Sequence, residues 1–131
     1  MSAPGCDDAP VITVPISTEP RDITLVMPYY DNFDWLGEQL FRWRTLPSEL
    51  QRHLSIVIVD DGTPKERSAF RALEANDELK HVHEWRQIGG SFVVYRIEVD
   101  VRWNWLAARN IGAHHARTTW IILTDMDHVL P

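Results

Sequence analysis

The sequence holds a single cysteine and no long apolar run. Because Cys6 has no second cysteine to pair with, no disulfide can form within the chain, which is typical of proteins from reducing compartments. No apolar stretch approaches the roughly 20 residues that a membrane-spanning helix needs. The opening residues also lack the basic and then apolar pattern of a secretory signal peptide. Together these absences predict a cytoplasmic protein with no membrane span.

Positive charge and glycine-rich loops are scarce as well. The formal net charge is −6, which argues against a nucleic-acid partner, because nucleic-acid-binding proteins need a basic face to neutralise phosphates. Neither common glycine-rich phosphate loop is present, since the pair Gly89-Gly90 stands alone. Cys6 lies in the N-terminal segment and does not suggest a nucleophile with a histidine partner. A nucleotide ligand is compatible with this composition if local cations or a metal ion bind its phosphates.

The composition suffices for one domain with a hydrophobic core. Apolar residues make up 44% of the 131 positions, and the six tryptophans can bury a large area. Prolines at positions 4, 10, 15 and 20 block regular strand pairing. Residues 1–21 are therefore predicted to form a flexible arm, with residues 11–16 as a candidate edge strand. The folded domain is expected over residues 22–131.

Apolar and β-branched runs predict strands that alternate with helices. Strands are expected over residues 23–27, 54–59, 92–99 and 119–124. The runs at 54–59 and 119–124 are almost wholly apolar, as in strands buried on both faces of a parallel sheet. Helices are expected over residues 34–44, 64–75 and 105–116. Short connections between these elements predict an α/β fold, with a Rossmann-like, mostly parallel sheet and flanking helices.

Individual residues refine these elements. Pro28 is expected to end the first strand, because it has no N–H for a ladder hydrogen bond. Thr63 followed by proline suits the cap of the second helix. The positions expected to face the core are Leu36, Leu40 and Trp43 in the first helix and Ala69, Phe70 and Leu73 in the second.

Acidic and aromatic polar residues follow three of the predicted strands. They are Tyr29-Tyr30-Asp31, Asp60-Asp61, and Asp125 with Asp127. The carboxyl ends of parallel strands share one edge of a sheet, where ligands bind in α/β proteins. Any one of these groups alone is as readily a helix cap or a solvated turn. Two carboxylates about 4 Å apart repel by about 4 kcal/mol at an effective dielectric of about 20, so three groups on one edge favour a bound cation.

Asp125 and Asp127 are the best candidates for cation ligands. Their spacing places both side chains on one side of an extended segment, with Met126 opposite. Oxygen ligands suit Mg²⁺ or Mn²⁺, and an ion held by two carboxylates has open positions for a diphosphate. His128 is a further candidate ligand, although a histidine beside such a site can instead orient a neighbour or face solvent.

The helix that precedes this strand carries Arg109, Asn110 and Gly112. An arginine here is either part of the helix surface or a phosphate contact, for which its planar fork of donors is suited. Gly112 disfavours the helix by about 1 kcal/mol relative to alanine, which indicates close packing against the sheet or a ligand. Tyr30 can stack on a flat base, or it can pack over the strand end.

Four segments, LVMPYYDN, IVIVDDGTP, AARNIGAHHA and ILTDMDH, resemble in this order the nucleotide-sugar-binding half of family 2 glycosyltransferases, which have the GT-A fold. The resemblance covers about residues 23–131. It implies a nucleotide-diphospho-sugar donor, usually a UDP-sugar, together with a divalent metal, Mn²⁺ or Mg²⁺, and an acceptor that the segments do not identify.

The resemblance also implies roles for single residues. Pro28 and Tyr30 match positions that stack on the base, and Asp60 and Asp61 match the pair that binds base and ribose. Further matches are the DxD motif at Asp125 and Asp127, for metal and donor, and the Arg-Asn-x-Gly motif at Arg109, Asn110 and Gly112.

Family members continue beyond the DxD motif with an acceptor-binding region and, in inverting members, an acidic catalytic base. None of those residues is in this sequence, so the catalytic residues are unknown, and the domain is expected to be incomplete. Its uncovered sheet edge is expected to favour self-association. Two alternatives stay open: a donor-binding module without transfer activity, and a phosphatase of the haloacid dehalogenase type, whose nucleophile motif TDMDHVL resembles.

Overall fold

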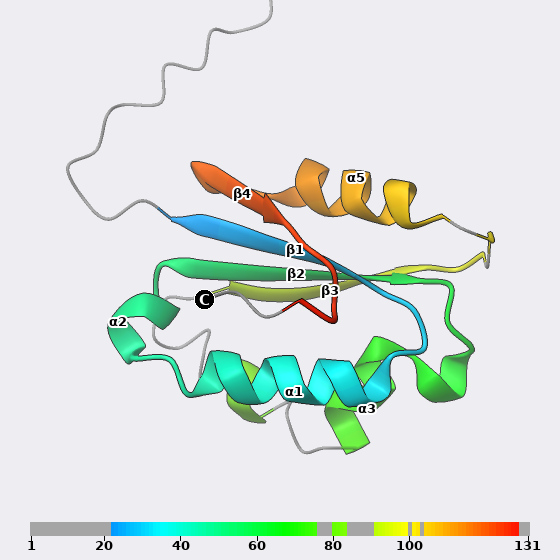
Figure 1. Cartoon of the computed structure of the whole chain (residues 1–131), viewed down its shortest axis with the longest axis horizontal. Helices are drawn as coiled ribbons and strands as arrows, with labels where there is room; N and C mark the ends of the chain where they lie inside the picture. The colour runs from blue at the N-terminus through cyan, green and yellow to red at the C-terminus, as the bar shows by residue number, and fades with distance from the viewer. Residues whose placement is uncertain (1–21, 76–79, 84–90, 100, 103, 129–131) are drawn as a thin grey trace, which may run out of the picture.

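The computed structural model describes residues 22–75, 80–83, 91–99, 101–102 and 104–128. Within these ranges the chain forms one four-stranded sheet with the order β3-β2-β1-β4, and every neighbouring pair is parallel. Helices cover both faces of the sheet (Figure 1). The strands are β1 (Ile23–Tyr29), β2 (Leu54–Asp61), β3 (Ser91–Ile97) and β4 (Trp120–Leu123). This architecture confirms the predicted Rossmann-like α/β fold.

One face of the sheet carries α1 and α3, and α5 lies on the other (Figure 1). The helices include α1 (Phe33–Arg44), α2 (Ser48–Gln51), α3 (Ala69–Ala75) and α5 (Trp105–His115), with a 3-10 turn η1 at Lys65–Arg67; residues 80–83 are helical as well. None of the helices in the described ranges has the length and apolar character needed to cross a membrane. The arm predicted over residues 1–21, with its candidate strand at 11–16, falls outside these ranges.

Two apolar clusters, one on each face, hold the layers together. Because side chains alternate along a strand, Leu25 and Met27 of β1 point toward α1, whereas Val26 points toward α5. The predicted stripe on α1 is confirmed, since Leu36, Leu40 and Trp43 are all buried. Gly112 of α5 lies against the sheet, where a Cβ atom would come within 2.2 Å of Val26 Cγ1. Its close packing, predicted from the sequence, is therefore against the sheet.

The structure corrects the prediction that Pro28 ends the first strand. β1 continues through Pro28 to Tyr29, and Tyr29 lies in register with Asp60. Pairing between β1 and β4 ends at Val26 and Leu123. One edge of β1 is thus free of a strand partner at Pro28 within the described sheet, so the missing N–H interrupts no ladder there.

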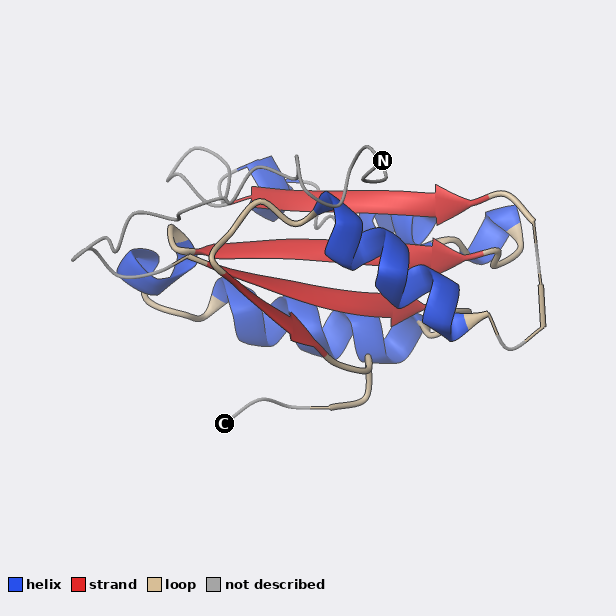
Figure 2. Cartoon of the chain, turned by 90° about the horizontal axis from the view of Figure 1, so that it is seen from above, coloured by secondary structure: helices blue, strands red, loops and turns tan. Residues whose placement is uncertain are grey.

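The prediction that the last apolar run is buried on both faces is also wrong. β4 pairs only with β1 among the described strands, and α5 packs mainly over β1 and β2. Figure 2, which looks onto the α5 face, shows β4 at the sheet edge beside the helix. All four of its side chains are exposed, from 36% for Ile122 to 56% for Trp120. The apolar run identified a strand without revealing its place in the sheet.

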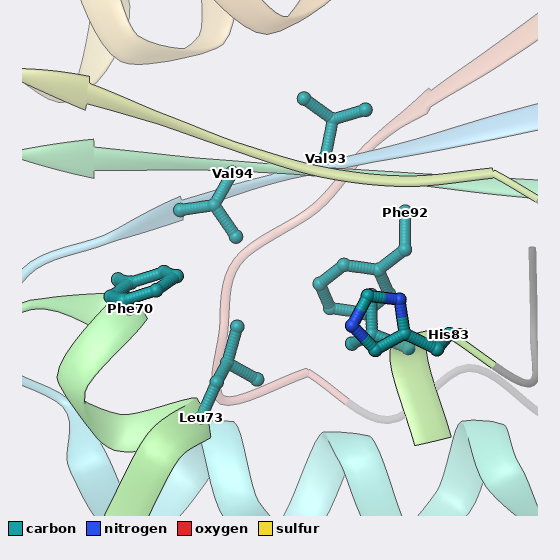
Figure 3. Close-up of a pocket in the computed structure, with 7 residues that line it drawn as sticks. Phe70, Leu73, His83, Phe92, Val93 and Val94 are labelled. Atoms are coloured by element: carbon teal, nitrogen blue, oxygen red, sulfur yellow. The ribbon is translucent and has the colours of Figure 1, made fainter. Parts of the chain in front are cut away.

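Two details of the second helix differ from expectation as well. Thr63 and Pro64 precede η1, and α3 begins only at Ala69, so Thr63 does not cap that helix. Ala69 and Leu73 are buried as predicted, but Phe70 is 52% exposed. Phe70 instead lines a pocket of about 350 Å³ beside the amino-terminal half of β3, together with Leu73, Val82, His83, Phe92, Val93 and Val94 (Figure 3).

Candidate metal and nucleotide site

The residues after β4 form a tight turn at the carboxyl edge of the sheet. The N–H of His128 donates to the carbonyl of Asp125 at 3.1 Å, and Met126 is buried in the core beneath the turn. The prediction of an extended segment here is therefore wrong. The turn still points Met126 inward and leaves Asp127 exposed and Asp125 half-buried.

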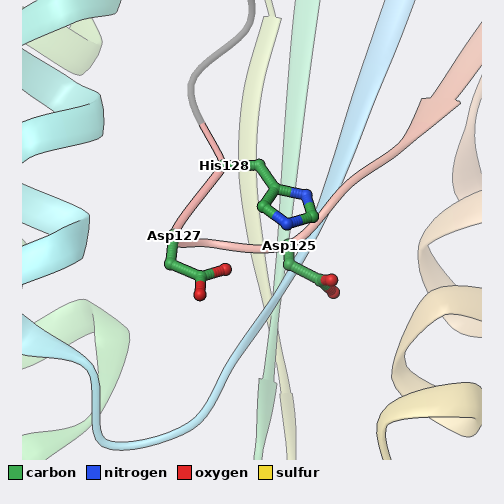
Figure 4. A group of neighbouring side chains, drawn as sticks. All are labelled: Asp125, Asp127 and His128. Carbon is green, nitrogen blue, oxygen red and sulfur yellow. The ribbon is translucent and has the colours of Figure 1, made fainter.

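Three potential metal ligands gather on this turn. One ligand atom each from Asp125, Asp127 and His128 lies within 4.8 Å of the others (Figure 4). Two ligands on opposite sides of a Mg²⁺ ion are about 4 Å apart, so the three side chains would have to move closer together to bind one ion. The donor set of two carboxylates and one imidazole fits a hard divalent ion, with positions left for a ligand.

Arg109 of α5 reaches this turn from one face of the sheet. Its Nη2 forms an ion pair with Asp125 Oδ1. The guanidinium also lies over the ring of Trp105, with Cζ 4.7 Å from the ring centroid, which fixes its direction. The neighbouring Asn110 is exposed on the same helix. Of the two motif residues, Arg109 is the one that contacts the turn.

Gln39 of α1 reaches the same turn from the other face. Its side chain is 2% exposed, and its Nε2 donates to the carbonyls of Met126, at 2.8 Å, and His128, at 2.5 Å. No sequence motif pointed to Gln39. The available signal was its position between Leu36 and Leu40, where a polar residue interrupts a core-facing stripe.

Asp60 and Asp61, the last two residues of β2, are more deeply buried than the carboxylates Asp125 and Asp127. Both are buried, at 1% and 6% exposure. Asp60 Oδ1 accepts from the N–H of Thr63 at 3.1 Å, and Oδ2 accepts from the N–H of Ala69 at 2.8 Å and faces Arg96 at 3.4 Å. Both carboxylate oxygens of Asp60 therefore bind donors of the chain itself.

The loops that follow β1 and β2 are tied together. The backbone of Asp31, at a φ of 45°, donates its N–H to the Thr63 hydroxyl at 2.9 Å. Arg67 adds an ion pair with the Asp31 carboxylate. These contacts connect residues that are distant in sequence, so no local pattern indicated them.

The two tyrosines at the end of β1 differ sharply. Tyr30 is 49% exposed at the loop surface, whereas Tyr29 is fully buried and its hydroxyl donates to the carbonyl of Arg67 at 2.8 Å. Burial, together with the negative charges of Asp60 and Asp31, raises the pKa of Tyr29 to about 12. Tyr29 is therefore a neutral part of the site's framework at physiological pH.

The carboxyl edge of this parallel sheet thus carries the turn at residues 125–128, called the DxD turn after Asp125 and Asp127, together with Arg109 from α5 and the ends of β1 and β2. A family model described as Glycosyl transferase family 2 matches residues 24–131. The chain belongs to glycosyl transferase family 2. This confirms the family indicated by the four sequence segments.

Solved structures agree with the family in fold. The chain is similar to S. aureus TarS 1-349, at 17% identity and a TM-score of 0.53 over 81% of this chain and 27% of that one; the same protein was also solved with UDP. It is similar to the mannosyltransferase PcManGT from Pyrobaculum calidifontis, solved with GDP-Man and Mn²⁺, at 19% identity and a TM-score of 0.57 over 87% of this chain and 30% of that one.

At these identities the likeness shows a shared GT-A fold and no more. The family 2 chain spans 27% and 30% of the length of these two proteins. No match was found among curated protein sequences.

Proposed function

We propose that this chain binds a nucleotide-diphospho-sugar, with UDP as the expected nucleotide, as the donor site of a glycosyltransferase. The observation that carries the proposal is the cluster of Asp125, Asp127 and His128 at the carboxyl edge, with Arg109 beside it. Family membership supports a donor of this class. The GDP-Man and Mn²⁺ bound to one structural neighbour and the UDP bound to another support it as well.

Asp125 and Asp127 are proposed to hold Mn²⁺ or Mg²⁺, with His128 as a third ligand. Such an ion neutralises the diphosphate and stabilises the departing nucleotide. Without an ion, the two carboxylates would repel the diphosphate, because all of these groups are negative.

Arg109 is proposed to contact the diphosphate while it holds Asp125. Its Nε–H is buried and has no acceptor among the residues that the structure describes. A ligand oxygen or a water molecule could satisfy this donor, since buried N–H groups are seldom left unpaired. Asn110 on the same helix is proposed as a weaker donor contact.

The nucleoside is proposed to lie over the ends of β1 and β2. The exposed ring of Tyr30, two residues after Pro28, offers a surface on which a base can stack. Asp61 is proposed to accept hydrogen bonds from the base or ribose. Asp60 was proposed for the same task, but its oxygens are already engaged, so its contribution is expected to be indirect.

Calorimetric titration tests donor binding directly. The chain is titrated with UDP-glucose, UDP-GlcNAc and GDP-mannose, each with Mn²⁺ and with EDTA, up to about 1 mM, the upper end of common KM values. We expect binding of at least one UDP-sugar that EDTA abolishes. Asp127→Ala should abolish this metal-dependent binding, whereas Glu49→Ala, which removes an exposed carboxylate on α2, should leave it intact. Absence of metal-dependent binding to all three donors would refute the proposal.

Donor binding and sugar transfer are separate expectations. Transfer requires a group that takes the proton of the acceptor hydroxyl, and none of the described residues has been assigned that task. The alternative is a module that binds the donor and does not transfer the sugar. Such a module would bind a UDP-sugar but release UDP slowly or not at all. A cytoplasmic location stays a prediction. The family match favours both readings over a haloacid dehalogenase-type phosphatase.

The exposed edge of β4 supports one further proposal. Among the described strands β4 pairs only with β1, and an apolar strand whose other edge is unpaired is a template for pairing with another strand. We expect a second copy of this chain to associate there at high protein concentration.

A further inference from the structure

The amide of Gln39 grips the backbone of the DxD turn on both sides of Asp127. Its Nε2 donates to the carbonyls of Met126 and His128, which belong to the residues immediately before and after Asp127. Gln39 is 2% exposed, so water cannot replace these two contacts without opening the core. A single buried donor group therefore holds the backbone on both sides of Asp127, and with it the positions of Asp127 and His128, two of the three candidate metal ligands.

The rest of the turn is held from the opposite face of the sheet. Arg109 of α5 pairs with Asp125, while Gln39 projects from α1, which is anchored by Leu36 and Leu40 in the core. The turn is thus fixed between two helices that lie on different layers (Figure 1). Anchoring of this kind keeps ligands in place before the ion arrives, when their mutual repulsion would otherwise spread them apart.

We propose that Gln39 is a positioning residue for the metal site. It contacts neither the ion nor the donor, and it acts by holding the backbone carbonyls that flank Asp127. The inference rests on the proposed function, because it requires that Asp125, Asp127 and His128 bind a divalent ion. Residues that orient metal ligands typically change metal affinity by about 10- to 100-fold when they are replaced.

Manganese binding by the isolated chain tests this role without any activity measurement. Free Mn²⁺ is counted by electron paramagnetic resonance as the ion is titrated into the protein with no nucleotide present. Gln39→Met keeps the length of the side chain and removes the donor, so it should weaken Mn²⁺ binding about 10-fold or more. Gln39→Asn keeps the amide on a stem that is one methylene shorter, and it should fall between wild type and Gln39→Met.

The chain contains a matched control in Gln51. Its Nε2 also donates to two backbone carbonyls, those of Trp43 and Arg44, each at 3.1 Å. These carbonyls lie at the end of α1 and not in the turn. Gln51→Met therefore removes the same kind of double contact, and it should leave Mn²⁺ affinity unchanged.

Hydrogen exchange of the metal-free chain supplies a second readout. Gln39→Met should speed exchange across residues 124–128, while Gln51→Met should not, because Gln39 donates to carbonyls of that segment and Gln51 donates to carbonyls of α1. If the wild-type chain binds no Mn²⁺, the proposed function fails. If the wild type and both Gln39 variants bind Mn²⁺ equally and exchange at equal rates, the positioning role alone is refuted. Circular dichroism shows which variants are folded. If Gln39→Met does not fold, the milder Gln39→Asn carries the test.

Discussion

Arg109 of α5 forms an ion pair with Asp125, the first carboxylate of the DxD turn. The pair joins the layer above the sheet to the carboxyl edge, and both side chains are partly accessible, at 23% and 47%. Arg109 therefore has two effects on the site: it neutralises one of the carboxylates that would bind an ion, and it presents positive charge to a diphosphate.

These two effects predict opposite responses to Arg109→Gln. Removing the cation should strengthen binding of Mn²⁺ alone by up to about fivefold, the equivalent of about 1 kcal/mol for a partly exposed ion pair. The same change should weaken binding of UDP at saturating Mn²⁺, because the diphosphate loses a charged donor. Calorimetry measures both, and Arg71→Gln, which removes an exposed pair with Glu74 on α3, serves as the control. A weaker affinity of Arg109→Gln for Mn²⁺ in the absence of UDP would contradict this account.

Gly112→Ala should destabilise the fold. Its new methyl group would meet Val26 Cγ1 at 2.2 Å and Val59 Cγ2 at 3.3 Å, and overpacking of this kind costs about 1–3 kcal/mol. The matched change Gly37→Ala places a methyl group in open space on α1, so it should stabilise the chain by about 0.5–1 kcal/mol through helix propensity. Urea unfolding of both variants measures the contrast, and equal effects would show that α5 can move away from the sheet.

Tyr29 should make the stability of the chain fall in alkaline solution. Its pKa is about 12 in the folded state and about 10 in an unfolded chain. Above pH 10 the unfolded state loses the proton first, so folded-state stability is complete below pH 10 and declines as the pH rises toward 12. Tyr29→Phe should reduce this decline, measured as the unfolding free energy between pH 9 and about 11. Tyr30→Phe is the control, because Tyr30 is exposed; a decline unaltered by Tyr29→Phe would exclude Tyr29 as its source.

Asp60→Asn should weaken the fold before it affects any ligand. The carboxylate accepts N–H groups of Thr63 and Ala69 and faces Arg96, and an amide can offer only one oxygen to these donors. Loss of a hydrogen bond to a buried charged group costs about 1.5–3 kcal/mol. Thermal unfolding should show this loss for Asp60→Asn and almost none for the exposed Asp34→Asn. A fully stable Asp60→Asn that has lost nucleotide binding would instead make Asp60 a direct ligand.

Ile122→Lys should suppress self-association of the chain. Ile122 lies in the exposed edge strand β4, and a charged side chain there opposes pairing with another strand. Sedimentation at rising protein concentration should show association for the wild type and a monomer for the variant. Leu50→Lys alters an apolar side chain on α2 that is even more exposed, at 57% against 36% for Ile122, and it should leave association unchanged. Association that survives Ile122→Lys would place the contact elsewhere.

Several features could be predicted because they follow from local patterns. The stripe Leu36, Leu40 and Trp43 repeats with the period of a helix, and the apolar run that became β2 has the length of a buried strand. Parallel strands place their carboxyl ends on one edge, so the residues after β1, β2 and β4 were expected together. The parallel pairing of β1 with β2 and with β4 confirms that these strand ends share one edge, whereas their joint action as one ligand site stays a prediction.

Other features depend on which segments become neighbours in space. The apolar run of β4 predicted a strand, but only the sheet order reveals that it lies at an edge and is exposed. Pro28 fits within β1 because β4 has already separated from it. The roles of Gln39 and Asp60 require knowledge of the carbonyls and N–H groups that surround them, and those groups come from distant parts of the chain.

The sequence by itself determined the α/β class, the core-facing stripe of α1, the family and the residue types at the carboxyl edge, because periodicity and motif order are local properties of the chain. Only the tertiary structure decided how the DxD turn is held, with Gln39 below and Arg109 above, and which acids are engaged by the chain itself. The physical reason is that hydrogen bonds and ion pairs act over a few ångströms, and residues separated by most of the chain come that close only after the sheet has formed.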